Sequence, residues 1–212
     1  MMTSNPAFVG IHLSYGRKPF TLALLDDELD LIMHPNCDIE EVSSILSELD
    51  AVTVCLATSS KSKSAKSANT NSMFYEQLEK LSFRPYPAQN ETRQRLKADA
   101  DESFRALLQK KLLPQRTLEG RIQRALVLYD QGLQINDPME FFEEITRYKL
   151  IQGILPLENL YTSKELDALV AAYVAWMTVN KPGQFMIQGE FILPAQGQNS
   201  PSNENPLLAL DA

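Results

Sequence analysis

The sequence is poor in cysteine and contains no long apolar run. Its two cysteines, Cys37 and Cys55, accompany a first segment that lacks the basic and apolar regions of a secretory signal. We therefore expect reduced thiols and a cytoplasmic location. No stretch reaches the roughly 18 apolar residues of a membrane-spanning helix, so no membrane contact is predicted.

Glycine is also scarce, and the charge balance is acidic. Only 8 of 212 residues are glycine, and neither a Walker pattern nor a dinucleotide-binding pattern occurs. The net charge of −7 argues against a protein that binds nucleic acid through its overall charge, although a local basic groove is not excluded. The acidic balance favours a protein partner or a small ligand over nucleic acid.

The most distinctive stretch is residues 166–177, which are apolar almost all the way round a helix. Such a pattern indicates a buried helix, and Thr162 with Glu165 predicts a capping box at its start. Its one charged residue is Asp167. A carboxylate in that setting must be paired, protonated, metal-bound or placed at a wet edge of the core.

The first third of the chain has the residue pattern of short strands separated by turns. Residues 8–14, 20–25 and 29–33 are predicted to form three strands joined by short turns, which is typical of an antiparallel meander. Asp38 and Glu41 predict a capped helix, and the apolar run 51–56 predicts a parallel strand buried on both faces. The expected fold class is therefore α/β, with a mixed sheet of antiparallel and then parallel strands.

The middle of the chain has a different composition. Residues 57–72 are rich in serine and lysine and are predicted to form a mobile loop, either solvated or in contact with a phosphate. Residues 73–133 are predicted to be a mainly helical insertion, with one helix over 91–113 that is broken around 98–101 and a second over 117–133.

The last part of the chain is predicted less uniformly. Residues 139–153 fit either a strand followed by a helix or one continuous helix, and residues 185–193 fit a strand or hairpin. Residues 195–212 have the composition of a disordered tail. Since no repeat and no second core occur, residues 8–194 are interpreted as a single domain.

The order of these elements resembles the RNase H-like fold. Several stretches are also similar to the family of predicted RNase H-like nucleases that is catalogued as domain of unknown function 429. The similar stretches are residues 9–14, 51–58, 166–172 and 191–194. The resemblance implies carboxylates at the carboxyl ends of the central strands, where Mg²⁺ or Mn²⁺ would support phosphodiester cleavage.

Within this resemblance, Asp167 alone keeps the acid of the family pattern. His12 stands where the first strand of the family has an aspartate, and Cys55 stands at the substituted position of the fourth strand. Glu144 corresponds to a family glutamate that precedes the late helix, although the proline of that motif is missing. His12 and Cys55 are poor ligands for a hard metal. The substitutions predict a degenerate site with a non-catalytic role in binding a protein, nucleic acid or a small ligand.

Two alternatives to that interpretation remain open at the level of sequence. The first is an active metal-dependent nuclease, in which His12, Asp26 or Asp27 completes a metal site with Asp167 and Glu144. The second is a Zn²⁺ site or a nucleophile–base pair, because the first and fourth strands of this fold are neighbours.

Each of the substituted residues also has a purely structural interpretation. His12 fits a satisfied core histidine, and Cys55 fits a small buried hydrophobic residue. If Asp167 is merely tolerated in a vestigial site, its replacement by leucine is predicted to be neutral or stabilising. A strong loss of stability would instead reveal that Asp167 has a real partner in the fold.

Overall fold

A six-stranded mixed sheet forms the centre of the computed structural model, which describes residues 7–58, 65–88, 90–139, 151 and 160–195. The strand order is β3-β2-β1-β4-β6-β5. The strands are β1 (Ala7–Leu13), β2 (Phe20–Leu25), β3 (Leu31–Cys37), β4 (Val52–Thr58), β5 (Arg84–Pro85) and β6 (Arg93–Asp99). The first three strands pair antiparallel, whereas β4 runs parallel to β1 and β6 runs parallel to β4. The predicted α/β class and the antiparallel-then-parallel sheet are confirmed.

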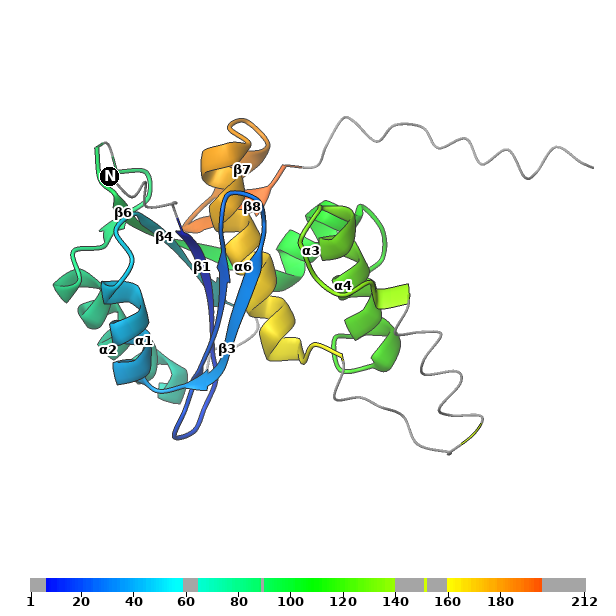
Figure 1. The fold of residues 1–212 in the computed structure, drawn as a ribbon, viewed down its shortest axis with the longest axis horizontal. Coiled ribbons are helices and arrows are strands. Elements are labelled where there is room, and N and C mark those ends of the chain that lie inside the picture. Colours follow the sequence, from blue (N-terminus) through cyan, green and yellow to red (C-terminus); the bar gives the residue numbers. More distant parts are fainter. Residues whose placement is uncertain (1–6, 59–64, 89, 140–150, 152–159, 196–212) are drawn as a thin grey trace, which may run out of the picture.

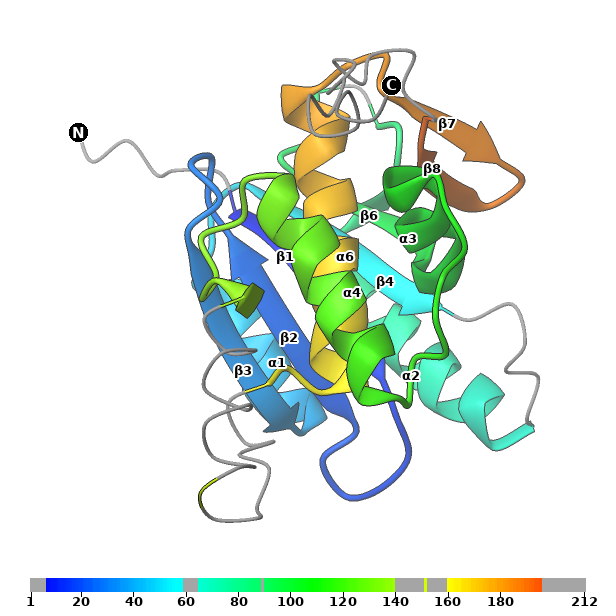
Figure 2. The same cartoon turned by 90° about the vertical axis from the view of Figure 1, so that its right-hand side faces the viewer.

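Helices cover both faces of this sheet (Figure 1). One face carries α1 (Ile39–Ser47) and α2 (Ala65–Lys80), and the other carries α6 (Ser163–Asn180). The helices α3 (Ala100–Leu108) and α4 (Leu118–Asp130) pack on α6, and the hairpin of β7 (Phe185–Gln188) and β8 (Phe191–Pro194) lies beside α3 (Figure 2). Since α6 lies between the sheet and these two helices, most of its residues between Leu166 and Thr178 are buried.

The enclosed position of α6 accounts for its composition. The helix begins as predicted, with the Thr162 hydroxyl accepting from the Glu165 amide and the Glu165 carboxylate accepting from the Thr162 amide. Eleven of its residues are buried, and they are apolar except for Thr178. A helix that contacts protein on all sides has no face left for charged side chains. The prediction of a buried, capped helix is therefore confirmed.

The helix α6 lies very close to β1 at Gly10. A Cβ atom on Gly10 would stand 1.9 Å from the backbone oxygen of Ala168 and 2.3 Å from the backbone nitrogen of Ala172. Only glycine leaves room for such an approach of helix and strand. The contact holds the first turns of α6 above the carboxyl end of β1, where His12 lies.

The opposite face of the sheet is packed by large side chains. As predicted, α1 begins with a capping box between Asp38 and Glu41. The side chains of α1 and α2 that enter this core include Val42, Leu46, Phe74 and Leu78. They meet residues of β1, β2 and β4 that point away from α6, so the sheet is buried on both faces.

Two segments differ from the sequence prediction. Residues 93–99, predicted as part of a helix, form β6 and join the main sheet, so the region 73–133 is not only a helical insertion. Burial against β4 outweighs the helix propensity of these residues. Residues 65–72, predicted as part of a mobile loop, belong to α2, while residues 57 and 58 belong to β4. Among the described side chains of α2, Phe74 and Leu78 in its second half enter the core.

The end of the chain follows the prediction where it is described. Residues 185–194 form the expected hairpin, which turns at Gly189 with a φ of 63°. The predicted tail beyond residue 195, the segments 140–150 and 152–159, and the serine- and lysine-rich residues 59–64 lie outside the described residues. Among the helices that are described, none combines the length and apolar character needed to cross a membrane.

Candidate functional site

Three polar side chains meet above the carboxyl end of β1. The Nδ1 atom of His12 lies 3.2 Å from Oδ2 of Asp167, and the Nε2 atom of Gln115 donates to Oδ1 of Asp167 at 2.6 Å. Both carboxylate oxygens of Asp167 are therefore engaged. We call His12, Asp167 and Gln115 the histidine–aspartate group.

Each member of the histidine–aspartate group comes from a different element. His12 lies near the end of β1, Asp167 lies in the second turn of α6, and Gln115 lies in the segment between α3 and α4. Ser163 fixes that segment, because its hydroxyl donates to the Gln115 carbonyl at 3.2 Å. The side chain of Gln115 also approaches the Ser163 carbonyl at 3.4 Å. The group thus ties the helical layer to the sheet.

The histidine–aspartate group is only partly covered. The side chain of His12 is 21% exposed and that of Asp167 is 14% exposed. When Nδ1 of His12 donates to Asp167, the neutral imidazole presents Nε2 as an acceptor. In the part of the chain that the structure describes, Nε2 of His12 has no hydrogen-bond partner. Nearby, the Lys164 ammonium donates to the Ser14 hydroxyl at 3.2 Å.

Cys55 does not lie beside His12. The two strands are neighbours as predicted, but the register pairs Cys55 with Gly10 and pairs His12 with Ala57. Cys55 has no exposed surface, and burial raises the pKa of its thiol well above the ordinary value. The residue is therefore a neutral thiol in the core beneath α6, which is the structural interpretation of this position.

The remaining acidic candidates are placed elsewhere or lie outside the described residues. Glu144 falls in the segment that is not described. Asp26 follows β2 at the amino end of β1, opposite to His12, and its carboxylate accepts from the backbone amides of Glu28 and Asp30. Asp27 follows it in the same turn. The structure therefore does not bring Asp26 or Asp27 to Asp167.

Sequence reasoning missed two side chains at this edge of the sheet. Gln115 lies in a segment without periodicity, so no sequence signal pointed to it. Asp99 ends β6, with Thr58 of β4 as its register partner, and its carboxylate accepts from the Glu102 amide as the N-cap of α3. Asp99 was hidden inside a predicted helix, although a capping pattern at this position was a signal for a helix that begins there.

The chemistry of the histidine–aspartate group is that of hydrogen bonding. Within the described residues, His, Cys, Asp and Glu nowhere form a group of three or more that could hold a metal ion. The described residues thus bring one carboxylate, that of Asp167, to His12, while Glu144 of the implied two-metal site lies outside them. They do not fit the Zn²⁺ site of His12, Cys55 and Asp167, because Cys55 does not lie beside His12. A comparison with models of protein families finds no match for this chain, and a comparison with curated proteins finds none either.

Proposed function

We propose that this chain is an RNase H-like protein related to predicted nucleases, and that its role is binding rather than phosphodiester hydrolysis. The order of the elements supports the relationship. The strand β1 lies between β2 and β4, and an acid-bearing late helix crosses it. This is the arrangement that the sequence resemblance implies.

The state of Asp167 carries the proposal. Two-metal hydrolysis needs several carboxylate oxygens that are directed at the metals. Here the oxygens of Asp167 are taken by His12 and Gln115, and the β4 residue next to His12 is Ala57. The carboxylate of Asp99 caps a helix. The carboxylates of Asp167 and Asp99 therefore make contacts within the fold and are not directed at a metal site. This favours a binding role over hydrolysis.

The charge of the chain indicates which partners suit this role. A net charge of −7 disfavours a phosphate backbone, which binds basic surfaces. The edge beside the histidine–aspartate group offers Nε2 of His12, which has no hydrogen-bond partner among the described residues, and the ammonium of Lys164. Both suit polar groups of a protein or small ligand. A protein or small-molecule partner is therefore favoured over nucleic acid.

The proposal is tested by cleavage assays on single- and double-stranded DNA and RNA with Mg²⁺, Mn²⁺ or Zn²⁺, alongside thermal shifts with the same ions. We expect no cleavage above that of a mock preparation and no selective stabilisation by any of the ions. The wild-type chain is compared with Asp167→Asn and with Asp130→Asn, which removes an exposed carboxylate at the end of α4.

One result would overturn the proposal in favour of the active nuclease. Robust cleavage that is lost in Asp167→Asn and kept in Asp130→Asn would assign catalysis to Asp167, with Glu144 as the second acid to be tested. Stabilisation by Zn²⁺ that is lost in both His12→Ala and Cys55→Ala would instead support the zinc alternative.

A further inference from the structure

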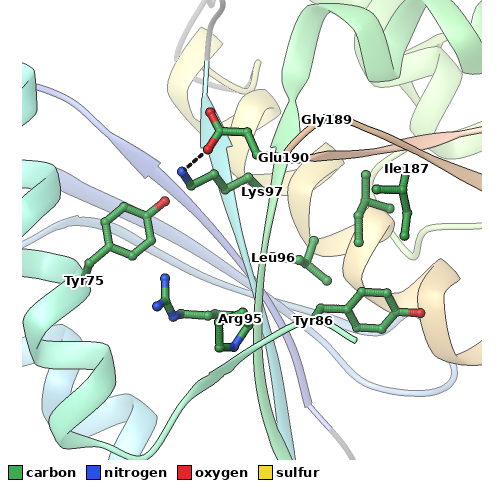
Figure 3. A pocket seen from close by; sticks show the side chains of 10 residues that line it. Tyr75, Tyr86, Arg95, Leu96, Lys97, Ile187, Gly189 and Glu190 are labelled. Atoms are coloured by element: carbon green, nitrogen blue, oxygen red, sulfur yellow. Dashed lines mark hydrogen bonds and ion pairs between the residues drawn. The ribbon is translucent and has the colours of Figure 1, made fainter. Parts of the chain in front are cut away.

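A second candidate site lies at the outer edge of β6, away from the histidine–aspartate group. A cavity of about 290 Å³ opens between α2, β6 and the turn of the β7–β8 hairpin (Figure 3). The histidine–aspartate group contributes no residue to its lining. Its volume lies just below the range for small-molecule pockets, which is roughly 300–1,000 Å³. The cavity therefore suits a small ligand.

The two sides of this cavity differ in chemistry because successive side chains of a strand point to opposite faces. Arg95 and Lys97 point to the face of α2, where each cation lies 5.0 Å from the ring centre of Tyr75. Leu96 points to the other face, where Tyr86 and Ile187 lie (Figure 3). The cavity thus joins a cationic side to an apolar side.

The cationic side already holds a carboxylate of the chain itself. Glu190, at the turn of the hairpin, places an oxygen 2.6 Å from the Nζ atom of Lys97. Glu190 lies at an exposed turn, and its side chain is 62% exposed. An exposed ion pair of this kind contributes little stability, so another anion can replace it at small cost.

Arg95 adds a donor that has no partner among the described residues. One of its terminal nitrogens lies 3.1 Å from the Glu79 carboxylate, but its Nε atom is buried and has no hydrogen-bond partner among the described residues. A buried polar atom without a partner is unfavourable and is often satisfied by a ligand or water. Lys97 and Arg95 together provide more donors than Glu190 and Glu79 use.

We propose that this cavity binds a small organic anion with an apolar body, such as an aromatic carboxylate. The carboxylate of the ligand replaces Glu190 on Lys97, and its body lies over Leu96 and Ile187 beside Tyr86. This inference goes beyond the proposed function, because the site and its ligand are separate from the histidine–aspartate group.

The test is a ¹H–¹⁵N NMR titration of the full chain with benzoate. Acetate supplies the charge without the apolar body, and benzyl alcohol supplies the body without the charge. We expect benzoate to shift the amide signals of Leu96, Lys97 and Gly189, and to bind at least about tenfold more tightly than either fragment.

Three variants locate the ligand. Lys97→Gln should weaken benzoate binding about tenfold, because it removes the charge-assisted contact. Glu190→Gln should strengthen binding about threefold, because it removes the competing carboxylate. Lys18→Gln is the matched control and should leave binding unchanged. Lys18 does not line the cavity, and its Nζ atom forms an exposed ion pair with Glu41 at 2.7 Å.

A further variant guards against loss of folding in Lys97→Gln. The side chain of Ile187 is 58% exposed, so Ile187→Ser keeps the core intact and should weaken benzoate but not acetate. Equal binding of benzoate to the wild type, Lys97→Gln and Ile187→Ser would overturn the proposal. So would benzoate-induced shifts confined to other parts of the chain, or the absence of any shift at about 10 mM. None of these results depends on the nuclease assays.

Discussion

The two faces of the central sheet are covered in opposite ways. On one face, α6 approaches so closely that the backbone of Ala168 would collide with any side chain on Gly10. On the other face, α1 and α2 reach the sheet through large buried side chains such as Phe74 and Leu78. The α6 face has no spare volume at its centre, whereas the other face depends on the volume that its side chains fill.

Polar side chains follow the same division. On the α6 face, His12, Gln115 and Asp167 gather at one end, where the helix leaves the crowded centre of the sheet. On the α2 face, Arg95 and Lys97 lie along an outer strand beside the cavity. On both faces, the candidate polar sites therefore lie at the rim of the sheet and not in its closely packed centre.

Gly10→Ala should have the largest effect and tests the close packing of the α6 face. The added methyl group would stand 1.9 Å from the Ala168 oxygen, so the helix or the strand must move. We expect the free energy of unfolding to fall by at least about 3 kcal/mol, or the chain not to fold. Urea unfolding followed by circular dichroism measures this change.

Gly16→Ala is the control for the change at Gly10. Its φ of 127° strains a new side chain, but apart from its two chain neighbours no described residue has an atom within 4 Å of the added Cβ. This variant should cost only about 1 kcal/mol. Equal costs at Gly10 and Gly16 would mean that the close approach of α6 does not limit stability.

Leu78→Ala tests the opposite face, which should be sensitive to lost volume. Leu78 is fully buried in α2, and its truncation leaves a cavity. We expect a loss of about 3 kcal/mol in the free energy of unfolding, and almost none for Lys80→Ala at the exposed end of the same helix. A loss below about 1 kcal/mol would show that this face repacks easily.

Alkaline pH should weaken the α6 face through Tyr173. Burial raises the pKa of Tyr173 from 10.0 to about 12, so the folded state favours the neutral phenol. The resulting stability is complete below about pH 10 and is lost as the pH rises towards 12. We expect wild type to lose about 1–2 kcal/mol more than Tyr173→Phe over this range in urea unfolding. Tyr129→Phe, at an exposed tyrosine, should instead behave like wild type.

Asp167→Leu should have the smallest effect. The sequence alone allowed a neutral or stabilising result, but Asp167 pairs with His12 and accepts a hydrogen bond from Gln115, and both side chains would lose this contact. We expect a loss of about 1 kcal/mol, because all three side chains lie near the surface. A double-mutant cycle with His12→Ala isolates the contact between the two residues. Stabilisation by Asp167→Leu would mean that the carboxylate is only tolerated.

The capped elements of the fold could be predicted from the sequence, whereas β6 could not. The side chains of Thr162 and Glu165 form local hydrogen bonds, and these mark the start of α6 without reference to the rest of the fold. The residues of β6 are mostly good helix formers. Their side chains alternate between two faces that Tyr75 and α6 cover, and the sequence alone does not show these two neighbours. Tertiary packing therefore decided that element.

The candidate site shows the same limit. The sequence placed His12 and Asp167 on elements that face each other, and they are in contact. It did not predict that Ala57 rather than Cys55 lies beside His12, because the register of a parallel pair depends on both strands and their neighbours. Gln115 was also unpredictable, since its position depends on how α3 and α4 pack on α6.

If the proposed binding role holds, the contact at Gly10 also fixes where a partner would meet the chain. Because backbone atoms of α6 rest against β1, the helix cannot slide along the strand without a collision. The imidazole of His12 is then oriented by Asp167 before any partner arrives, and little conformational entropy remains to be lost on binding. Recognition at this edge would therefore depend on the orientation of the partner. Its polar group would have to approach the imidazole of His12 in the ring orientation that Asp167 already fixes.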